Sequence, residues 1–153
     1  MSTSNFDDPR HLPFIRLLDE ALELYSTQLA ARMADSDYTD LRYSHGCVFG
    51  NVDQEGTRLT DLADRAHMTK QSVGEVASDL EKRGYVERVP DPTDGRAKII
   101  RLTERGRRAR AIGRELIDEV EREWAERFGA ERVVALREAL EVITAERLGA
   151  IPA

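Results

Sequence analysis

The sequence predicts a mainly α-helical chain with one small β-hairpin, and three observations support this fold class. Two short apolar stripes with helical spacing follow one another across a tight turn within residues 59–83. Directly afterwards, an Asp-Gly pair lies between two short runs that contain Val and Ile. Long helical stripes flank this middle segment on both sides. The order helix, turn, helix, strand, hairpin and strand is that of a winged helix-turn-helix, held between N- and C-terminal helices.

The N-terminal part is expected to begin with an arm and a long helix. Residues 1–9 are polar and show no periodicity, which predicts a mobile arm. Residues 10–53 are assigned to helices that serve dimerisation and support. The first of these helices is predicted over 12–33, where the spacing of three and four residues recurs along Ile15, Leu18, Leu22, Tyr25, Leu29 and Met33.

A second helix is expected over about 39–52, after the break at the Asp-Ser-Asp of residues 35–37. Its two glycines, Gly46 and Gly50, are four residues apart and favour the close approach of another helix, at a cost in helix propensity. His45 falls on the apolar face of this predicted helix. An imidazole there would suit a sensor, because it would titrate near neutral pH or contact a ligand. The alternative is a hydrogen-bonded structural histidine.

Residues 54–106 contain the predicted winged unit, and its first half is a helix-turn-helix. The first short helix has its apolar residues at Leu59, Leu62, Ala63 and Ala66. The second helix repeats that pattern at Val73, Val76, Ala77 and Leu80. Thr69 is well placed to cap the second helix, which leaves its first turn exposed and its free backbone N–H groups available to a phosphate.

The second half of the unit is predicted to be a two-stranded wing. Gly84 suits a helix C-cap, and strands are expected over 85–89 and 98–102. Residues 90–96 form the intervening loop, and Asp94-Gly95 marks the expected tip of the hairpin.

Residues 107–153 are assigned to C-terminal dimerisation helices. Thr103 is expected to cap a long helix that Gly129 ends, and the apolar residues of the last helix follow a paired-helix spacing at Val133, Leu136, Leu140 and Ile143. The terminal helices carry more apolar stripe than a small winged unit can cover. We therefore expect them to pack against a second copy of the chain in a two-fold homodimer.

The charge distribution favours a nucleic-acid partner although the formal net charge is −6. Residues 82–110 contain ten Lys or Arg against four Asp or Glu, a balance of +6, so the remainder carries −12. A basic stripe on an acidic body is typical of a selective DNA binder. The alternative for Arg105, Arg107, Arg108 and Arg110 is that they only solvate a helix surface.

The candidate DNA contacts lie at two places in the winged unit. The first turn of the second helix would meet base edges in the major groove through Thr69, Lys70, Gln71 and Ser72, with Glu75 one turn further on. The hairpin would reach the minor groove with Arg96 and a phosphate with Lys98. The alternative for the hairpin is a plain solvated loop.

Five motifs in this order resemble the DNA-binding core of the multiple antibiotic resistance regulator (MarR) family. They are Leu62-Ala63, Met68-Thr69-Lys70-Gln71, residues 80–88 (LEKRGYVER), residues 91–96 (DPTDGR) and residues 102–106 (LTERG). The resemblance implies a homodimeric transcriptional regulator with recognition helices in successive major grooves and wing arginines in the flanking minor grooves. It implies that Asp94 orients Arg96. It also implies a repressor that a small-molecule effector releases from an inverted-repeat operator.

The sequence departs from the family at two positions. His67 stands where many relatives have glycine in the turn between the two helices, so a left-handed backbone there would carry a cost. Gly95 stands where relatives often carry a basic residue between the wing aspartate and arginine. Both departures bear on DNA affinity rather than on the fold.

Other function classes find little support. The sequence lacks the glycine-rich, nucleophile-elbow and zinc-protease motifs of common enzymes, so we expect no catalysis and no cofactor. A winged-helix module for protein contacts, without sequence-specific DNA binding, is the rival, but it would not need Arg96 and Lys98 together with an open Lys70-Gln71-Ser72 turn. The absence of a membrane-length apolar run and of a signal pattern predicts a cytoplasmic protein.

Three further residues are candidates for sensing. Tyr25 and His45 are the candidate contacts of a small-molecule effector. Cys47 is the only cysteine, which agrees with a reducing compartment, and a redox switch there would need a cationic neighbour that only His45 offers. The histidines and this cysteine show no zinc-like spacing.

Overall fold

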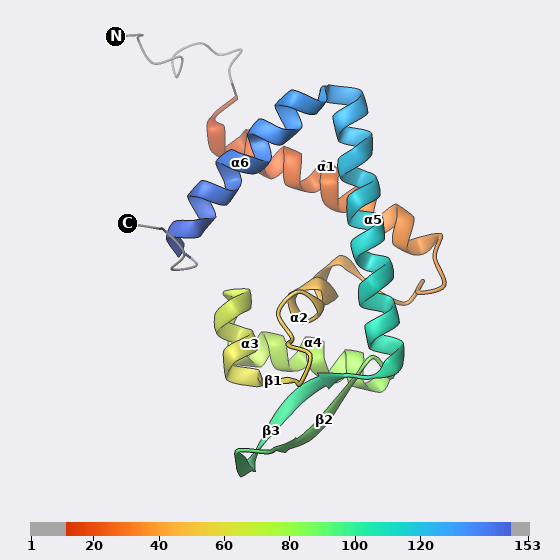
Figure 1. The fold of residues 1–153 in the computed structure, drawn as a ribbon, viewed down its shortest axis with the longest axis vertical. Helices are drawn as coiled ribbons and strands as arrows, with labels where there is room; N and C mark the ends of the chain where they lie inside the picture. Colours follow the sequence, from red (N-terminus) through yellow and green to blue (C-terminus); the bar gives the residue numbers. More distant parts are fainter. Residues whose placement is uncertain (1–11, 148–153) are drawn as a thin grey trace. The chain divides into compact units, whose positions relative to one another are not determined.

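The computed structural model describes residues 12–147, and its elements follow the predicted order (Figure 1). The chain divides into two compact units, with the boundary after Arg114, inside the helix that spans Glu104–Phe128. The N-terminal arm predicted over residues 1–9 lies outside the described residues. The elements are α1 (Phe14–Ala34), the 3₁₀ turn η2 (Tyr43–His45), α2 (Gly46–Phe49), β1 (Thr57–Arg58), α3 (Leu59–Ala66), α4 (Lys70–Lys82), β2 (Val86–Asp91), β3 (Asp94–Leu102), α5 (Glu104–Phe128) and α6 (Ala130–Arg147).

The first predicted helix is confirmed and the second is wrong. Helix α1 ends at the expected break, with Asp35 as its C-cap. In place of a helix over 39–52, only η2 and the four-residue α2 form. The reason lies at Arg42, whose backbone is extended (φ −123°, ψ 157°) and whose N–H donates to His45 Nδ1 at 3.0 Å, so that the helical stretch begins only at residue 43.

The two glycines of this stretch do not receive another helix, which corrects the sequence prediction. A Cβ built at Gly46 meets no heavy atom within 4 Å, and one built at Gly50 meets only the Gly46 carbonyl oxygen at 3.1 Å, among the described residues. Within residues 12–147, no neighbouring helix uses the space that these two glycines leave.

The helix-turn-helix is confirmed in detail. Thr69 caps α4, because its Oγ1 accepts a hydrogen bond from the Ser72 backbone N–H at 3.1 Å. Gly84 follows α4 with φ +77°. His67 adopts the left-handed conformation (φ 52°, ψ 39°) and is the only non-glycine residue with positive φ among residues 12–147. The turn therefore carries the backbone cost that its sequence predicts.

The wing belongs to a three-stranded antiparallel sheet with the order β1-β3-β2. The two-residue strand β1, which pairs Thr57 with Ile100, was not predicted because two residues carry no periodicity. The predicted hairpin tip at Asp94-Gly95 is wrong. Asp91 pairs with Asp94, so the turn is Pro92-Thr93.

The position of this turn follows from its side chains. The Asp91 carboxylate accepts hydrogen bonds from the Thr93 backbone N–H at 2.8 Å and from the Thr93 hydroxyl at 2.7 Å. Pro92 supplies the fixed φ that suits the first central position of a turn. Gly95 lies within β3 without a positive φ, so its conformational freedom is not used.

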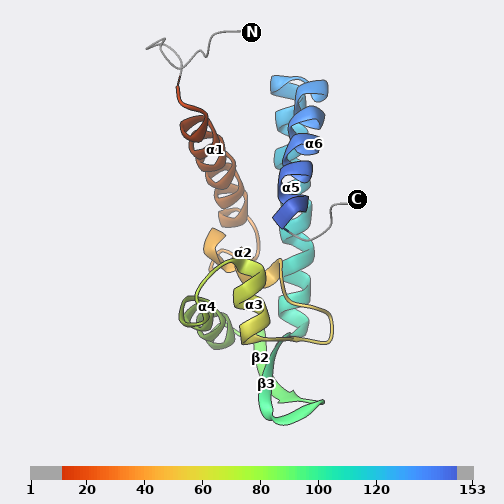
Figure 2. The same cartoon turned by 90° about the vertical axis from the view of Figure 1, so that its left-hand side faces the viewer.

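The core of the first unit lies between α3, α4 and the sheet. Leu62, Val73 and Leu80 are fully buried there, and residues from α2 and from the start of α5 complete the cluster, including Val48 and Ala109. The hairpin β2–β3 extends beyond α3 and α4, away from this core (Figure 2). A rigid packed base therefore carries the wing.

Helix α5 begins as predicted, because Thr103 Oγ1 accepts from the Gly106 backbone N–H at 3.1 Å. It ends at Gly129, which has φ +101°. In the second unit, Arg137 of α6 forms ion pairs with Glu121 of α5 and with Glu141. None of the helices within residues 12–147 is long and apolar enough to cross a membrane.

Candidate nucleic-acid interface

The first turn of α4 presents polar side chains on a well-capped helix end. Thr69, Lys70 and Gln71 are exposed, while Ser72 is half-buried because its hydroxyl lies 2.8 Å from Thr69 Oγ1. Lys70 forms no ion pair with any residue that the structure describes. The backbone N–H groups and the unpaired ammonium group at this helix end together favour an anionic partner.

One turn further on, Gln71 and Glu75 form a pair on the exposed side of α4. Gln71 Nε2 donates to Glu75 Oε1 at 3.2 Å, and both side chains are exposed. A glutamine amide can bond the major-groove edge of adenine, and a carboxylate can accept from the amino group of cytosine. The structure thus brings together two side chains that suit base recognition.

The exposed side of α4 borders an open groove that continues past the predicted contacts. Its lining includes Leu59, Lys70, Gln71, Gly74, Glu75, Ser78, Asp79, Lys82 and Arg88. Sequence reasoning missed Ser78 and Lys82, although they continue the four-residue spacing that runs from Lys70 to Gly74, which indicates one helix face. Arg88 reaches the same groove from β2 and donates to Ser78 Oγ at 2.9 Å.

The wing carries its three predicted residues, Asp94, Arg96 and Lys98, all exposed on β3. Asp94 Oδ1 accepts from the Arg96 backbone N–H at 3.1 Å. The aspartate therefore holds the main chain at Arg96, while the guanidinium group extends from it. Neither Arg96 nor Lys98 is paired with a carboxylate within residues 12–147.

The turn end of the wing is fixed by a contact that the sequence did not indicate. Arg58 of β1 donates from Nε to Asp91 Oδ2 at 2.5 Å. The Thr93 hydroxyl and N–H, together with this guanidinium group, lower the pKa of Asp91 to about 2. The carboxylate is therefore ionised at any physiological pH, and it ties β1 to the turn at the end of the hairpin.

The arginines at the start of α5 are bound within the chain. Arg107 and Arg108 both pair with Glu104, at 3.0 and 3.1 Å, and hold the pKa of that carboxyl below its ordinary value. Arg110 donates to the Val52 carbonyl oxygen at 3.0 Å, and Arg105 donates to the Tyr85 hydroxyl at 2.9 Å. The contacts of Arg110 and Arg105 fasten α5 to the winged unit, and all four arginines are engaged, so the basic excess of residues 82–110 is only partly available to a partner.

The two candidate effector contacts differ in their surroundings. Tyr25 is half-buried on α1, and His45 is only 3% exposed. His45 Nδ1 accepts from Arg42 N–H and its Nε2 donates to Asp79 Oδ2 at 3.0 Å, so both ring nitrogens are engaged within the chain, as a structural histidine requires. The joint use of these two residues by an effector stays a prediction.

Burial also decides the state of the single cysteine. It raises the pKa of the half-buried Cys47 thiol, which keeps the group protonated and poorly nucleophilic. The described residues contain no group of three His, Cys, Asp or Glu side chains placed to hold a metal ion.

A helix-turn-helix joined to a cationic hairpin defines a winged-helix protein, and the comparisons show which proteins it is similar to. Residues 39–97 match the MarR family. The chain is 32% identical over 80 residues to the transcriptional regulator HosA of Escherichia coli O111:H-, a match that covers 52% of this chain and 59% of HosA. It is 29% identical over 105 residues to the uncharacterized HTH-type transcriptional regulator YdcH of Bacillus subtilis (strain 168), covering 67% and 71%.

Solved structures agree with this assignment over more of the chain. CouR from Rhodococcus jostii RHA1, bound to p-coumaroyl-CoA, is similar with a TM-score of 0.72 and 25% identity, covering 99% of this chain and 98% of CouR. The reduced form of MarR from E. coli has a TM-score of 0.75 at 18% identity, covering 87% and 97%, and shows the shared fold. The winged unit is therefore similar to the MarR family of transcriptional regulators, and the chain as a whole shares the fold of solved proteins such as CouR and MarR.

Proposed function

We propose that this protein is a homodimeric transcriptional regulator that binds double-stranded DNA at an inverted repeat. In each protomer, the first turn of α4 enters the major groove and reads bases through Gln71 and Glu75, with Thr69, Lys70 and Ser72 beside them. Arg96 enters the adjacent minor groove and Lys98 contacts a phosphate. Asp94 holds the backbone from which Arg96 extends.

The observation that carries this proposal is the placement of unpaired cations. Most arginines of the basic segment are bound to carboxylates or carbonyl oxygens of the chain itself, whereas Lys70, Arg96 and Lys98 have no such partner among the described residues. These three lie at the exposed start of α4 and on the wing. Cationic side chains left without a partner at both places suit the phosphates and grooves of one duplex.

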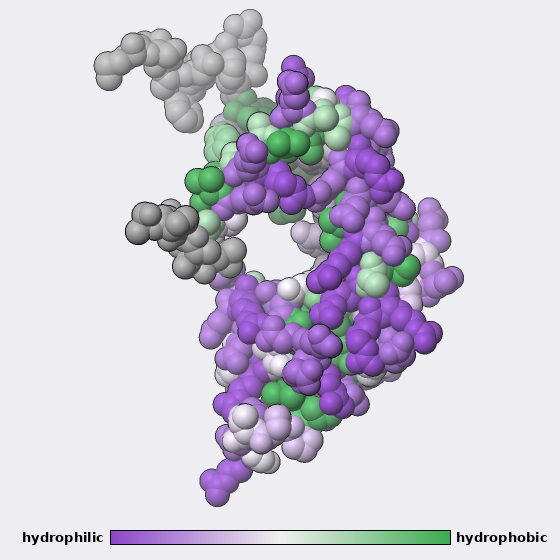
Figure 3. Space-filling view, in the orientation of Figure 1, coloured by the Kyte–Doolittle hydropathy of each residue, from purple (hydrophilic) through white to green (hydrophobic). Residues whose placement is uncertain are grey.

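The apolar surface of the terminal helices supports the proposed dimer. Phe14 and Ile15 of α1 are 65% and 67% exposed, and Val142 and Ile143 of α6 are 73% and 61% exposed. Figure 3 shows hydrophobic surface, in green, over these helices. A second copy that covers this surface produces two-fold symmetry, and hence half-sites about 10 base pairs apart.

The regulator acts as a repressor in the cytoplasm, and a small molecule releases it from DNA. It has no catalytic activity. The support is the relative CouR, whose structure holds p-coumaroyl-CoA. The dimer would release DNA when a ligand binds more tightly to the conformation in which the separation of the recognition helices does not match the operator. Tyr25 and His45 are the proposed contacts. Adding p-coumaroyl-CoA to a preformed complex and measuring release tests this step, and full retention of DNA would contradict release by this ligand class.

Selection of bound fragments from random DNA, followed by a salt titration, tests the main proposal. We expect a symmetric site and a binding constant that falls steeply with salt. Gln71→Ala should relax base preference, while Arg96→Ala should weaken binding to all sequences. Arg108→Ala is the matched control, because this exposed arginine is already paired with Glu104. Equal losses for the two arginine variants would contradict the role given to unpaired cations.

The rival function is a winged-helix module for protein contacts. It predicts that no DNA sequence is enriched and that the binding constant for any duplex depends only weakly on salt. The same selection therefore separates the two functions.

A further inference from the structure

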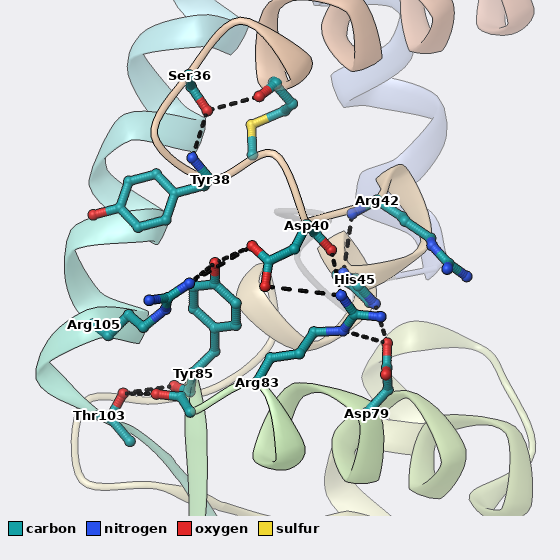
Figure 4. Close-up of polar contacts among 12 residues, drawn as sticks. Ser36, Tyr38, Asp40, Arg42, His45, Asp79, Arg83, Tyr85, Thr103 and Arg105 are labelled. Carbon is teal, nitrogen blue, oxygen red and sulfur yellow. Dashed lines mark hydrogen bonds and ion pairs between the residues drawn. The ribbon is translucent and has the colours of Figure 1, made fainter.

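A continuous polar network joins the segment after α1 to the end of α4 and the start of α5, away from the proposed DNA contacts (Figure 4). Asp40 lies at its centre. The side chains of Arg83 and Tyr85, which follow α4, and of Arg105 in α5 point toward this aspartate (Figure 4). The proposed function uses none of them.

Tyr85 is the buried member of the network. The residue has no exposed surface, and its hydroxyl donates to Asp40 Oδ1 at 2.6 Å while it accepts from Arg105 Nη2 at 2.9 Å. The guanidinium carbon of Arg105 also lies 4.6 Å from the centre of the Tyr85 ring. Burial and the neighbouring carboxylate raise the pKa of Tyr85, so the hydroxyl keeps the proton that it donates.

The last turn of the recognition helix is held by the same segment at two points. Arg83 Nη1 donates to the Asp40 main-chain oxygen at 3.0 Å, and its Nε donates to Asp79 Oδ2 at 2.9 Å. The same Asp79 oxygen accepts from His45 Nε2 at 3.0 Å. The C-terminal end of α4 is therefore fixed to the segment between α1 and α2.

The backbone of Tyr85 completes the junction. Its N–H donates to the Leu80 carbonyl oxygen of α4 at 2.9 Å, and its own carbonyl accepts from Thr103 N–H at 3.0 Å, one residue before α5. A Cβ on Gly106 would lie only 2.0 Å from that carbonyl oxygen, so the first turn of α5 rests directly on Tyr85. Tyr85 thus contacts the end of one helix and the beginning of the other.

We propose that Asp40 and Tyr85 are positioning residues that fix the angle between α4 and α5, and thereby the separation of the two recognition helices in the dimer. This inference rests on the proposed function, in which α1 and α5 belong to the dimer and α4 reads DNA. Thirteen residues make α4 about 20 Å long, so a rotation of about 10° moves its reading end by about 3 Å. That displacement is close to the rise of one base pair, about 3.4 Å.

The experiment measures binding to duplexes that carry two selected half-sites at a series of spacings. The variants are Tyr85→Phe, Asp40→Ala and the double variant, with Tyr38→Phe as the matched control. The Tyr38 ring lies 6.1 Å from that of Tyr85, but its hydroxyl makes no hydrogen bond with any residue that the structure describes. Both tyrosine variants therefore remove one hydroxyl from the same aromatic cluster, and only one of them cuts the network.

The wild type and Tyr38→Phe should prefer one spacing over a spacing longer or shorter by one base pair. In Tyr85→Phe we expect this preference to shrink by about five- to tenfold, the size of a typical coupling between sites. Binding to a single isolated half-site should be unchanged. Because Asp40→Ala removes the same hydrogen bond, the double variant should lose no more preference than the larger single loss.

Each result decides between the alternatives. If the wild type binds DNA as proposed and Tyr85→Phe keeps the same spacing preference, this inference is overturned and the proposed function is not. If Tyr85→Phe loses binding to a single half-site in proportion to its loss of thermal stability, the role of Tyr85 is merely structural. That result also overturns the inference. Should Asp40→Ala fail to fold, Asp40→Asn keeps an acceptor for Tyr85 and is expected to retain more preference than Tyr85→Phe. Absence of DNA binding by the wild type at every spacing overturns the proposed function itself.

Discussion

Leu80 in α4 and Leu22 in α1 both lie on the apolar stripe of an amphipathic helix, yet Leu80 is fully buried and Leu22 is 55% exposed. The same contrast holds for the regions around them. The winged unit buries its stripes against its own sheet and α2, whereas α1 has no buried residue and the described side chains of α6 are likewise not buried. One region completes its core within the chain, and the terminal helices leave apolar surface for another molecule.

The largest effect should follow from placing a charge on that open surface. Ile15→Asp adds a carboxylate to an exposed position of α1, so it costs little in a single chain but opposes burial in a dimer. We expect sedimentation to show monomers at micromolar concentration. Affinity for a two-half-site duplex should fall by about a hundredfold or more, because the second half-site contact is no longer intramolecular.

Arg16→Ala provides the control on the same helical turn. This side chain is exposed and, among residues 12–147, forms an ion pair only with Glu20 at i,i+4, so its loss should leave both the dimer and DNA affinity near those of the wild type. If Ile15→Asp sediments as a dimer, the exposed stripe of α1 has another role and the comparison between the two regions loses its functional meaning.

A second prediction uses one chemical change at both positions of the comparison. Leu80→Ala leaves a cavity in the core of the winged unit and should lower its free energy of unfolding by about 2–5 kcal/mol. Leu22→Ala creates no cavity in the chain alone. Its unfolding midpoint should instead become more dependent on protein concentration, because only the dimer loses contact. Denaturation of both variants at two concentrations separates these outcomes.

The order of the elements could be predicted because it rests on local signals. Thr69 and Thr103 cap helices, Gly84 and Gly129 follow them, and the apolar spacing between them is regular. The wing loop is a clear exception. Asp94-Gly95 is a common hairpin pair, but the stronger local bonds of Asp91 with Thr93 placed the turn two residues earlier.

The unpredicted features depend on contacts between distant residues. The bond of Arg58 to Asp91 and that of Tyr85 to Asp40 join positions 33 and 45 apart, and neither leaves a periodic trace in the sequence. The second predicted helix failed partly for the same reason, because an apolar spacing over 39–52 exists but Asp40 is held by Arg83 and Tyr85, and His45 by Asp79 of α4. At the candidate interface, the residue types predicted the exposed cations. They did not predict which arginines are paired within the chain.

Two glycines of α5 offer a third test, at smaller scale. Gly106 rests on Tyr85, so Gly106→Ala forces the helix start away from a backbone oxygen and should destabilise the winged unit by about 1–3 kcal/mol. A Cβ at Gly113 meets no described atom within 4 Å, so Gly113→Ala should stabilise the helix by up to about 1 kcal/mol. Equal effects in thermal unfolding would contradict the packing described at Gly106.

The smallest expected effect is a pH dependence that belongs to the packed region alone. Burial lowers the pKa of His45 below 6.5, although Asp79 opposes the shift, while Arg83 and Arg42 add to it. Protonation would also place a hydrogen on Nδ1, where the Arg42 N–H now donates. The folded state therefore binds fewer protons than the unfolded chain, so this contribution to stability is present above pH 6.5 and is lost as the pH falls below that value.

His45→Gln should flatten the pH dependence, because a glutamine amide can donate to Asp79 without titrating. The free energy of unfolding, measured between about pH 7.5 and pH 5.5, would show a smaller slope than in the wild type. His67→Asn is the control, since His67 is exposed in the turn between α3 and α4 and asparagine also tolerates its left-handed backbone. A wild-type slope in His45→Gln would mean that the buried imidazole is not the group that responds between about pH 7.5 and pH 5.5, and would contradict this prediction.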